Sequence, residues 1–514
     1  MPNLRHAPGP YADLLPATES LRWPAGTTES LLESFRVHTF RRENAHEGSY
    51  SQWDCDLGKP AVCQEDRKCR HSEPGAEEEV CVVCNGLYEG RWKSRVRYSR
   101  RNPVRYAAPS LDVYGPAFDR ALRSLNKAGA TGLGAFQSYP TIGEALGHDG
   151  ISFSRERIEL LRVIVRERLE CLSRAEDPPQ EQEEAQSKGR AKEEARQSGP
   201  KDVKLIIKDE LHKLQKIEQG RERLIFILSL EDQMVDRMLF QTWVEEKPDE
   251  VTSKVGWSPL PAGYRAIERD FPGGGLATDC SAFDWTLPGW LAREIVALKI
   301  SQTCAASDEW RRAVWRRAAE VIGPKCVVRL PNGERFRQTN WGLMKSGWFL
   351  TIAVNGACQA LLVSAAEVYL GLPERKAWAM GDDLLIGAPP DCEAFVGLMD
   401  FMGVVVKQFS VCSEFAGFDF SKPGAPTPLY ATKHLERLRW VPEDMLETYA
   451  MAYGLYYALA NETASPKIRL IKQFVDRHSP WPPWLYHQWA LGLDTSGGPA
   501  ARLPDTLKEA VRWL

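Results

Sequence analysis

The feature that most constrains the fold of this chain is the tripeptide Gly381-Asp382-Asp383, which stands between two short apolar runs, residues 377–380 and 384–386. Apolar runs on either side of a glycine predict two buried strands joined by a tight hairpin, because glycine adopts the backbone conformations that such a turn requires. The hairpin would present two carboxylates, and Mg²⁺ prefers oxygen ligands of this kind, usually with substrate phosphates completing its shell. The tripeptide alone fits an acidic turn in solvent equally well.

A second acidic strand end lies upstream of the hairpin. Residues 272–275, a proline followed by three glycines, interrupt the chain, and the run that follows ends at Asp279, with Asp284 just beyond it. A carboxylate among apolar neighbours is costly to bury unless it is paired or bound to a metal, although a single one is often only a capping group. Two acidic strand ends in one chain favour a shared site for divalent cations.

Residues 345–356 lead into an apolar helix that we expect to continue to about Leu370. Thr351 and Asn355 lie one helical turn apart and share a face of this helix. The length would suit a membrane span, but Asn355 and Glu367 would then lie in hydrocarbon, where polar groups are expensive. The sequence therefore predicts a buried helix with a polar face and no transmembrane segment.

Three motifs, in their order along the chain, resemble motifs A, B and C in the palm of the RNA-dependent RNA polymerases of positive-strand RNA viruses. These motifs are Asp279-x4-Asp284, Ser346-Gly347-x3-Thr351-x3-Asn355 and Gly381-Asp382-Asp383. Residues 208–225 resemble motif F, the basic strand of the fingers. The residues around the motifs resemble most the sobemovirus, polerovirus and barnavirus type, and the resemblance covers roughly residues 120–440.

The resemblance implies a right-hand polymerase of mixed α and β structure, with fingers, a palm built on an antiparallel sheet, and a helical thumb. A chain of 514 residues, 43% of them hydrophobic, is long enough for about three such lobes. The expected divisions are an N-terminal extension (1–100), fingers (101–270) with a charged flexible insertion (174–202), a palm (271–412) with a finger insertion (about 300–340), and motif E with the thumb (413–514). Apolar residues at helical spacing over 158–172 predict a core helix of the fingers, with Ser154 as its N-cap.

The chemistry of such a polymerase explains the aspartates. Joining a ribose 3′-hydroxyl to the α-phosphate of a nucleoside triphosphate needs a deprotonated nucleophile and neutralised phosphate charge, which two metal ions about 3.5 to 4 Å apart supply. By the resemblance, Asp279 and Asp382 bridge two Mg²⁺ or Mn²⁺ ions and Asp383 is a supporting ligand. Neighbouring side chains on a strand point to opposite faces, so Asp382 and Asp383 cannot contribute equally.

The resemblance also assigns residues that bind the nucleotide. Asp284 and Asn355 would contact the ribose 2′-hydroxyl, which distinguishes RNA from DNA, with Ser346, Gly347 and Thr351 beside them. The basic residues that would hold the triphosphate are Lys208, Lys216, Arg221 and Arg223, and the guanidinium of Arg223 can bind phosphate bidentately. A charge run exposed to solvent is the alternative for this basic segment.

Three further segments resemble other motifs of the family, and two of them also have a plain structural interpretation. Lys407 resembles the motif D lysine that protonates the departing pyrophosphate, and a lysine at a strand end is also common as a solubilising edge residue. Residues 414–418 resemble motif E, without the cysteine that the family often carries there. The glycine-rich residues 129–134 resemble the template-entry motif G, or form a plain surface loop.

The formal net charge of -3 is not that of an obvious nucleic-acid coat protein. RNA binding depends on local clusters of basic residues rather than on the sum of charges. Two such clusters are present, at residues 91–101 and 311–317. The second is spaced like a helix face and fits a solvated surface equally well.

The 12 cysteines are scattered without a secretory signal, which indicates reduced thiols in a cytosolic protein. Cys81 and Cys84 form a knuckle-like pair that Cys63, Cys69 or His71 could close into a zinc site. The spacing matches no standard zinc finger. Structural Zn²⁺ and reduced cysteines in an irregular extension are both open.

The sequence therefore predicts an RNA-directed RNA polymerase that transfers nucleotides to an RNA 3′ end during viral genome replication. We expect an RNA template, a product strand and nucleoside triphosphates as partners, and a protein primer and other viral replication proteins remain open. The expected location is the host cell cytoplasm, in a replication complex that partners recruit to membranes. The alternatives are a catalytically inactive RNA-binding scaffold and, against the ribose contacts of Asp284 and Asn355, a reverse transcriptase.

Overall fold

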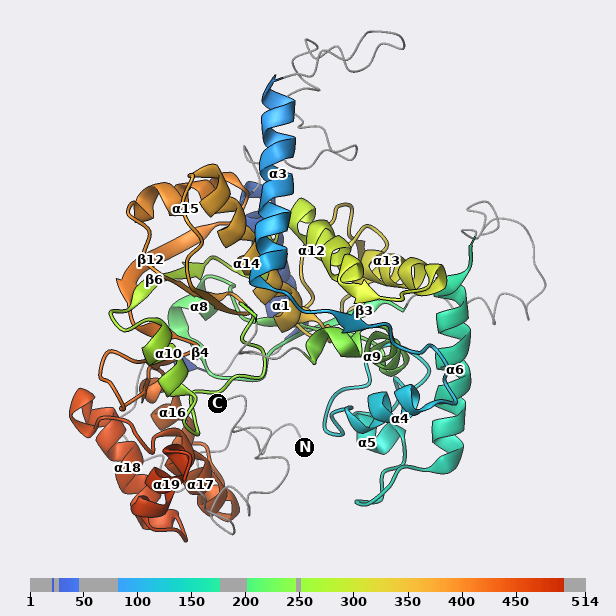
Figure 1. Ribbon diagram of the computed structural model, residues 1–514. Helices are drawn as coiled ribbons and strands as arrows, with labels where there is room; N and C mark the ends of the chain where they lie inside the picture. Colours follow the sequence, from blue (N-terminus) through green and yellow to red (C-terminus); the bar gives the residue numbers. More distant parts are fainter. Residues whose placement is uncertain (1–20, 23–26, 46–81, 176–200, 246–250, 494–514) are drawn as a thin grey trace.

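The computed structural model describes residues 21–22, 27–45, 82–175, 201–245 and 251–493. Helices and strands are mixed along the chain, as expected. In Figure 1 the C-terminal helices α16 to α19 form one lobe, helices α4, α5 and α6 form another, and the strands β6 and β12 lie between the first lobe and helix α15.

The palm is a four-stranded antiparallel sheet, which confirms the expected architecture. The strands follow the order β10-β11-β6-β12, so β6 lies between β11 and β12. Leu384 pairs with Thr278, and Gln408 pairs with Asp279. The strands are β6 (Gly275–Cys280), β10 (Ala377–Met380), β11 (Asp383–Ile386) and β12 (Val406–Cys412).

Hydrophobic cores cover both faces of the palm sheet, and strands buried on both faces read as continuous apolar runs. On one face, Leu276 and Leu384 join the core formed by helices of the palm and fingers. On the other, Trp378 and Leu385 join the core of the thumb. The palm helices are α11 (Phe283–Thr286), α12 (Gly289–Ser301), α14 (Thr351–Tyr369) and α15 (Cys392–Phe401).

A second four-stranded sheet, of order β5-β3-β8-β9, belongs to the fingers. Helix α1 (Thr28–Ala45) packs on it, and Leu31 and Phe35 lie in its core. The described parts of the first hundred residues are thus built into the body of the protein. The strands here are β3 (Val203–Ile207), β5 (Leu224–Ile227), β8 (Val327–Arg329) and β9 (Arg335–Arg337), and β1 (Leu21–Arg22) pairs separately with β4 (His212–Lys213).

The expected core helix of the fingers is present as α6 (Arg155–Ser173), with Leu161, Val165 and Leu169 buried. Ser154 occupies the N-cap position, but its side chain makes no capping hydrogen bond. The other fingers elements are α4 (Pro116–Arg123), α5 (Ile142–Ala145), α8 (Leu214–Glu218), α9 (Leu230–Val244), α13 (Asp308–Ile322) and the parallel pair β2 (Tyr106–Ala107) and β7 (Thr303–Cys304).

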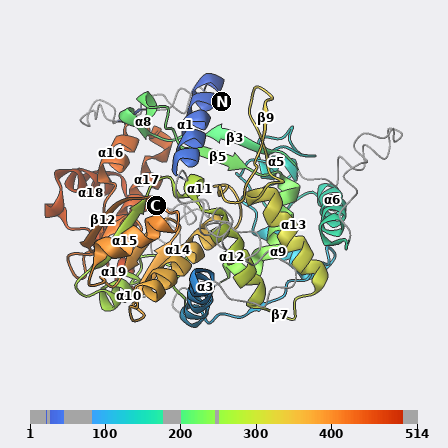
Figure 2. The ribbon, with the colours of Figure 1, turned by 90° about the horizontal axis from the view of Figure 1, so that it is seen from above.

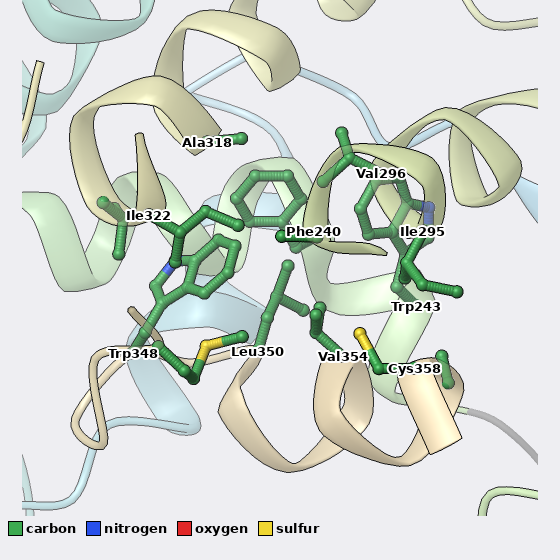
Figure 3. Packing of buried hydrophobic residues seen from close by; sticks show 14 of the residues in the cluster. Phe240, Trp243, Ile295, Val296, Ala318, Ile322, Trp348, Leu350, Val354 and Cys358 are labelled. Atoms are coloured by element: carbon green, nitrogen blue, oxygen red, sulfur yellow. The ribbon is translucent and has the colours of Figure 1, made fainter. Parts of the chain in front are cut away.

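Fingers and palm share one hydrophobic core. Figure 3 shows Phe240 and Trp243 of α9 among Ile295 of α12, Ile322 of α13 and Val354 of α14. The four helices therefore hold the palm and the fingers together as one unit.

A buried network of ion pairs also joins α6, α9 and α13. Arg168 contacts Asp232 at 3.2 Å and also contacts Glu320. Arg317 contacts Asp236 at 2.7 Å and Asp232 at 3.3 Å. Burial opposes the charge of Arg317, but Asp232 and Asp236 raise its pKa above the ordinary value. Both guanidiniums are therefore charged inside the protein and depend on their carboxylate partners.

The thumb begins with a three-stranded sheet and continues as helices. Its core includes Leu435, Tyr453 and Phe474, together with Phe415 and Phe418 of the small sheet. The thumb elements are β13 (Glu414–Phe415), β14 (Phe418–Asp419), β15 (Thr427–Pro428), α16 (Ala431–Leu438), α17 (Leu446–Tyr456), α18 (Pro466–His478), α19 (Pro483–Ala490) and the short turns Glu443–Met445 and Glu462–Ala464. Helix α10 (Tyr264–Asp270) packs against this core through Tyr264 and Ile267.

The basic cluster at residues 91–101 lies on helix α3 (Val82–Arg101), which packs along α14 (Figures 1 and 2). Four of its five arginines reach glutamates of two palm helices rather than an open RNA-binding face. The ion pairs are Arg91–Glu294 at 2.8 Å, Arg95–Glu294 at 2.5 Å, Arg97–Glu367 at 3.3 Å and Arg101–Glu367 at 2.8 Å. The interpretation of this cluster as an RNA-binding patch is therefore corrected to a docking contact between helices.

The second basic cluster, on α13, also makes contacts inside the protein. Arg317 belongs to the buried network, and Arg312 donates to the carbonyl of Ser173 at 3.0 Å. Arg316 donates to the carbonyls of Leu172 at 3.2 Å and Arg174 at 2.6 Å. Cations at a helix C-terminus satisfy its free carbonyls, so Arg312 and Arg316 serve as a cap for α6.

Among the described residues, α14 is the one helix long and apolar enough to span a membrane, and 83% of its apolar window is buried inside the protein. Glu367 on this helix is fully buried and paired with arginines of α3. This placement agrees with the predicted buried helix.

We expect Arg168→Met to destabilise the protein by about 3–5 kcal/mol, because it leaves Asp232 and Glu320 buried without one of their partners. Arg166→Met on the same helix is the matched control. Arg166 is 45% exposed and pairs with Glu170 at 3.8 Å, so its loss should cost less than about 0.5 kcal/mol. Urea unfolding of both variants measures the difference, and equal stabilities would show that the network contributes nothing.

Candidate active site

The two acidic strand ends lie side by side in the palm sheet. Because Leu384 pairs with Thr278, the same register places Asp383 opposite Asp279, and opposite residues in such a pair have Cα atoms about 4.5–5.5 Å apart. Asp382 precedes β11 in the turn, where Gly381 has a φ of 65°. The structure thus brings the three predicted aspartates to one end of the sheet.

The aspartates affect one another's ionisation. Asp382 and Asp383 are exposed, yet partial loss of water around them is the largest effect on both. Desolvation, and then the charges of Asp382 and Asp279, raise the pKa of Asp383 to about 7. Desolvation also raises the pKa of Asp382, against the lowering effects of its backbone hydrogen bond and Arg223. The site therefore holds negative charge in excess and favours a cationic ligand.

Lys407 also lies at this end of the sheet. Its Nζ is 2.9 Å from Oδ2 of Asp279, with both side chains more than half exposed. The pairing of β12 with β6 shifts in register between Val406 and Gln408, and a β-bulge of this kind redirects a side chain. The structure therefore places Lys407 with the aspartates rather than at a remote sheet edge.

Among the described residues, no group of three or more histidine, cysteine, aspartate or glutamate side chains is arranged to hold a metal ion by itself. Asp279, Asp382 and Asp383 nevertheless offer the hard oxygen atoms that Mg²⁺ takes, and Mg²⁺ commonly completes its shell with water and substrate phosphates. The raised pKa values of Asp382 and Asp383 also indicate carboxylates without full neutralisation. The donor set therefore fits a divalent cation that is shared with a phosphate.

The Ser346–Gly347 loop rests on strand β5 of the fingers. A Cβ atom at Gly347 would lie 2.0 Å from the carbonyl oxygen of Phe226, so only glycine fits. The Phe226 amide donates to Oγ of Ser346 at 3.3 Å. Oγ1 of Thr351 donates to the carbonyl of Lys345 at 2.6 Å. These three predicted nucleotide-binding residues thus fix the loop that directly precedes α14.

Asp284 and Asn355 meet directly. Nδ2 of Asn355 donates to Oδ1 of Asp284 at 2.7 Å. Desolvation, and to a lesser degree Asp382, raise the pKa of Asp284 to about 6, against the lowering effect of Asn355. The side-chain oxygen Oδ1 of Asn355 is buried and has no hydrogen-bond partner among the described residues. The pair therefore has an unused acceptor.

Two of the four predicted basic residues, Lys208 and Arg223, are held by Glu210, which the sequence did not single out. Its carboxylate contacts Lys208 at 2.9 Å, Arg223 at 3.0 Å and Lys433 of the thumb helix α16 at 3.1 Å. Although desolvation opposes it, Lys208 and the other two cations lower the pKa of Glu210 to about 2. Glu210 therefore keeps its charge and positions the cations.

The cations of the basic segment also influence one another. Desolvation, and then Arg223, Arg221 and Lys407, lower the pKa of Lys216. Desolvation lowers the pKa of Arg223, whereas Glu210 and, to a lesser degree, Asp382 raise it. The positively charged fingers segment and the negatively charged palm aspartates thus adjoin each other.

The predicted zinc ligands lie outside the residues whose side chains the structure describes. Cys63, Cys69 and Cys81 lie outside the described residues, and Cys84 lies in α3 with its side chain outside them.

The glycine-rich segment is described: a Cβ atom at Gly132 would lie 2.3 Å from the carbonyl oxygen of Leu228. Gly132 therefore allows this segment to lie close against the backbone of the fingers just before α9.

Comparison with known proteins places this geometry in context. Residues 179–408 match the family described as viral RNA-dependent RNA polymerase. Protein P1-P2 of potato leafroll virus is 30% identical over 288 residues, covering 51% of this chain and 25% of that protein. Replicase polyprotein P2AB of cocksfoot mottle virus is 31% identical over 250 residues, covering 46% and 25%. The chain spans about a quarter of the length of these two relatives.

A third relative, the RNA-directed RNA polymerase of mushroom bacilliform virus, is 28% identical over 300 residues, covering 54% of this chain and 69% of that protein. The solved Sicinivirus 3Dpol RNA-dependent RNA polymerase has a similar fold, with a TM-score of 0.57, 14% identity and 95% of each chain covered. The predicted resemblance to the sobemovirus, polerovirus and barnavirus type is confirmed. Residues 179–408 of this chain are thus similar to the viral RNA-dependent RNA polymerase family.

Proposed function

We propose that this chain copies an RNA template into RNA, by transferring nucleotides from nucleoside triphosphates to the 3′ end of a growing strand in viral genome replication. The observation that carries the proposal is the meeting of Asp279 and Asp383 on adjacent strands, close to the charge of Arg223. The names of the relatives, replicase and RNA-directed RNA polymerase, support the same activity.

The polymerase family generally uses divalent metal ions. In this chain Asp279 and Asp382 would hold two Mg²⁺ or Mn²⁺ ions, with Asp383 as a supporting ligand. Such ions supply neutralisation of phosphate charge and activation of the attacking 3′-hydroxyl.

The basic residues act on the triphosphate. Arg223, placed by Glu210 at 3.0 Å, binds phosphate oxygens through its planar guanidinium, whereas Lys208, Lys216 and Arg221 contribute positive charge. Lys407, whose Nζ lies 2.9 Å from Asp279, would give a proton to the leaving pyrophosphate.

The Asp284–Asn355 pair contacts the ribose. The Asp284 carboxylate, which Nδ2 of Asn355 holds at 2.7 Å, can accept a hydrogen bond from a 2′-hydroxyl, which a deoxyribose lacks. Ser346, Gly347 and Thr351 keep the loop before α14 in the position that this contact requires.

The partners and the location belong to the same proposal. RNA template, product strand and nucleoside triphosphates are the substrates that this site requires. We place the protein in the host cytoplasm, in a replication complex that other viral proteins bring to membranes. The name of one relative, a replicase polyprotein, supports an origin by cleavage from a longer chain.

We expect Asp382→Asn to reduce nucleotide incorporation on a primed RNA template by at least about 1,000-fold, because it removes the charge that would hold the cations, which is worth several kcal/mol. Asp476→Asn, an exposed position on the thumb helix α18, is the matched control and should keep full activity. Incorporation of radiolabelled UMP with Mg²⁺ measures both variants. Wild-type protein that binds RNA but incorporates no nucleotide would support the scaffold alternative instead.

We expect Asn355→Ala to weaken discrimination between ribonucleotides and deoxyribonucleotides by about 10- to 100-fold. A site that hydrogen-bonds a substrate hydroxyl rejects the analogue without it, and loss of Asn355 releases the Asp284 acceptor from its position and weakens this penalty. The ratio of kcat/KM for UTP and dUTP is the measurement. A wild-type ratio that favours dUTP would support a reverse transcriptase.

The raised pKa of Asp284, about 6, predicts that Asp284→Asn stabilises the protein at high pH. An unfolded aspartate titrates near 3.9, so the folded wild type binds this proton more tightly and loses stability as the pH rises from about 4 through 6. Asparagine carries no charge and can still accept the hydrogen bond from Asn355. Its advantage should reach up to about 3 kcal/mol at pH 8, since one pKa unit is about 1.4 kcal/mol.

Urea unfolding in a chelating buffer at pH 4, 6 and 8 measures this advantage. A difference between Asp284→Asn and wild type that stays constant across the three pH values would contradict the assignment of the raised pKa to Asp284.

A further inference from the structure

The beginning of the thumb helix α16 reaches the candidate active site. Tyr430 stands directly before this helix, and its carbonyl accepts the His434 amide at 3.0 Å. Its ring is 54% exposed and rests on the turn between β13 and β14. A Cβ atom at Gly417 would lie 2.7 Å from the ring, and the Leu429 amide donates to the Gly417 carbonyl at 2.9 Å. An exposed aromatic ring is thus held in a defined place.

The charges of the aspartates act on this ring. Desolvation, and then the charges of Asp383 and Asp382, raise the pKa of Tyr430, and Arg223 acts in the opposite direction. Lys433, less than one helical turn further along, contacts Glu210 at 3.1 Å, and Glu210 holds Arg223 at 3.0 Å. The start of α16 is therefore tied to the fingers on one side and to the β13–β14 turn on the other.

We propose that the exposed face of the Tyr430 ring stacks on the 3′-terminal nucleotide of the growing RNA strand and positions its 3′-hydroxyl at the aspartates. The inference rests on the proposed polymerase function. A copying enzyme must accept any base at the strand end, and aromatic stacking does so because every base has a π-face.

The geometry of the reaction indicates that Tyr430 contacts the growing strand rather than the incoming nucleotide. In phosphoryl transfer the attacking and leaving oxygens lie roughly in line on opposite sides of the phosphate. The cations of the fingers, Lys216, Arg221 and Arg223, mark the side of the leaving pyrophosphate. Asp383 and Asp382 act on Tyr430 more strongly than Arg223 does, and its ring is held on the thumb side by the β13–β14 turn. The attacking strand end is therefore the group that it meets.

The test is a series of substitutions that separates stacking from packing on the Gly417 turn. Tyr430→Phe keeps the ring, Tyr430→Leu keeps apolar bulk without a π-face, and Tyr430→Ala removes both. We measure the half-life of the complex with primed RNA after one nucleotide has been incorporated, and the KM for the next nucleoside triphosphate. Phe should match wild type within about twofold, while Leu and Ala should shorten the half-life by about 5- to 100-fold with KM within about twofold.

Trp484→Ala is the matched control, an aromatic side chain of the thumb that is 58% exposed on α19. It should leave the half-life unchanged. As a direct probe, a primer with 5-iodouridine at its 3′ end should cross-link to Tyr430 under ultraviolet light in wild type and in Trp484→Ala, and not in Tyr430→Leu.

Three results would overturn the inference. A wild-type half-life for Tyr430→Leu would show that the ring only packs on the turn. A raised KM with an unchanged half-life would assign the ring to the incoming nucleotide. A cross-link that persists in Tyr430→Leu would place the strand end elsewhere.

If Tyr430→Ala does not fold, the comparison of Tyr430→Phe with Tyr430→Leu decides. Wild-type protein without incorporation would refute the proposed function itself, whereas an active wild type with three equal variants refutes only the role of Tyr430.

Discussion

The pairing of β6 with β11 on one side and β12 on the other is the constraint on which the rest of the site depends. This register sets Asp383 against Asp279 and brings Lys407 to within 2.9 Å of Asp279. A slip by one residue would turn every side chain of the strand to the other face. Here that slip would exchange the two buried faces, because Leu384 packs toward the palm helices and Leu385 toward the thumb. Hydrophobic packing on both faces therefore places the charges.

Charged side chains perform most of the positioning outside the sheet. Glu210 gathers Lys208 and Arg223 of the fingers with Lys433 of the thumb, and Glu367 binds Arg97 and Arg101 of α3. Each carboxylate joins segments that are far apart in the chain. Breaking such a pair leaves an uncompensated charge in a poorly hydrated place, which is costly. The positive charge near the aspartates is thus held by neighbours from two lobes, and a chain of net charge -3 still presents a local basic surface.

Much of the fold and of the site was predictable from the sequence, because the relevant signals are local. Short apolar runs that end in Asp279 and precede Asp383 predicted strands, and the apolar helix with Asn355 was confirmed as a buried helix. The basic clusters show the limit of such signals. A run of arginines has the same appearance whether it faces RNA or a glutamate of another helix, so Arg101 and Arg317 could not be assigned before Glu367 and Asp236 were seen beside them.

By itself the sequence determined which residue types occur at strand ends and helix starts, and hence the chemistry that this protein can perform. Carboxylates after apolar strands, a glycine at 347 and an amide on a buried helix are properties of short segments. The tertiary structure alone decided which separate groups meet: Glu210 with Lys433, Asp284 with Asn355 at 2.7 Å, and Tyr430 with the turn at Gly417. The physical reason is that local propensity acts over a few residues, whereas these contacts arise from the packing of whole sheets and helices against one another.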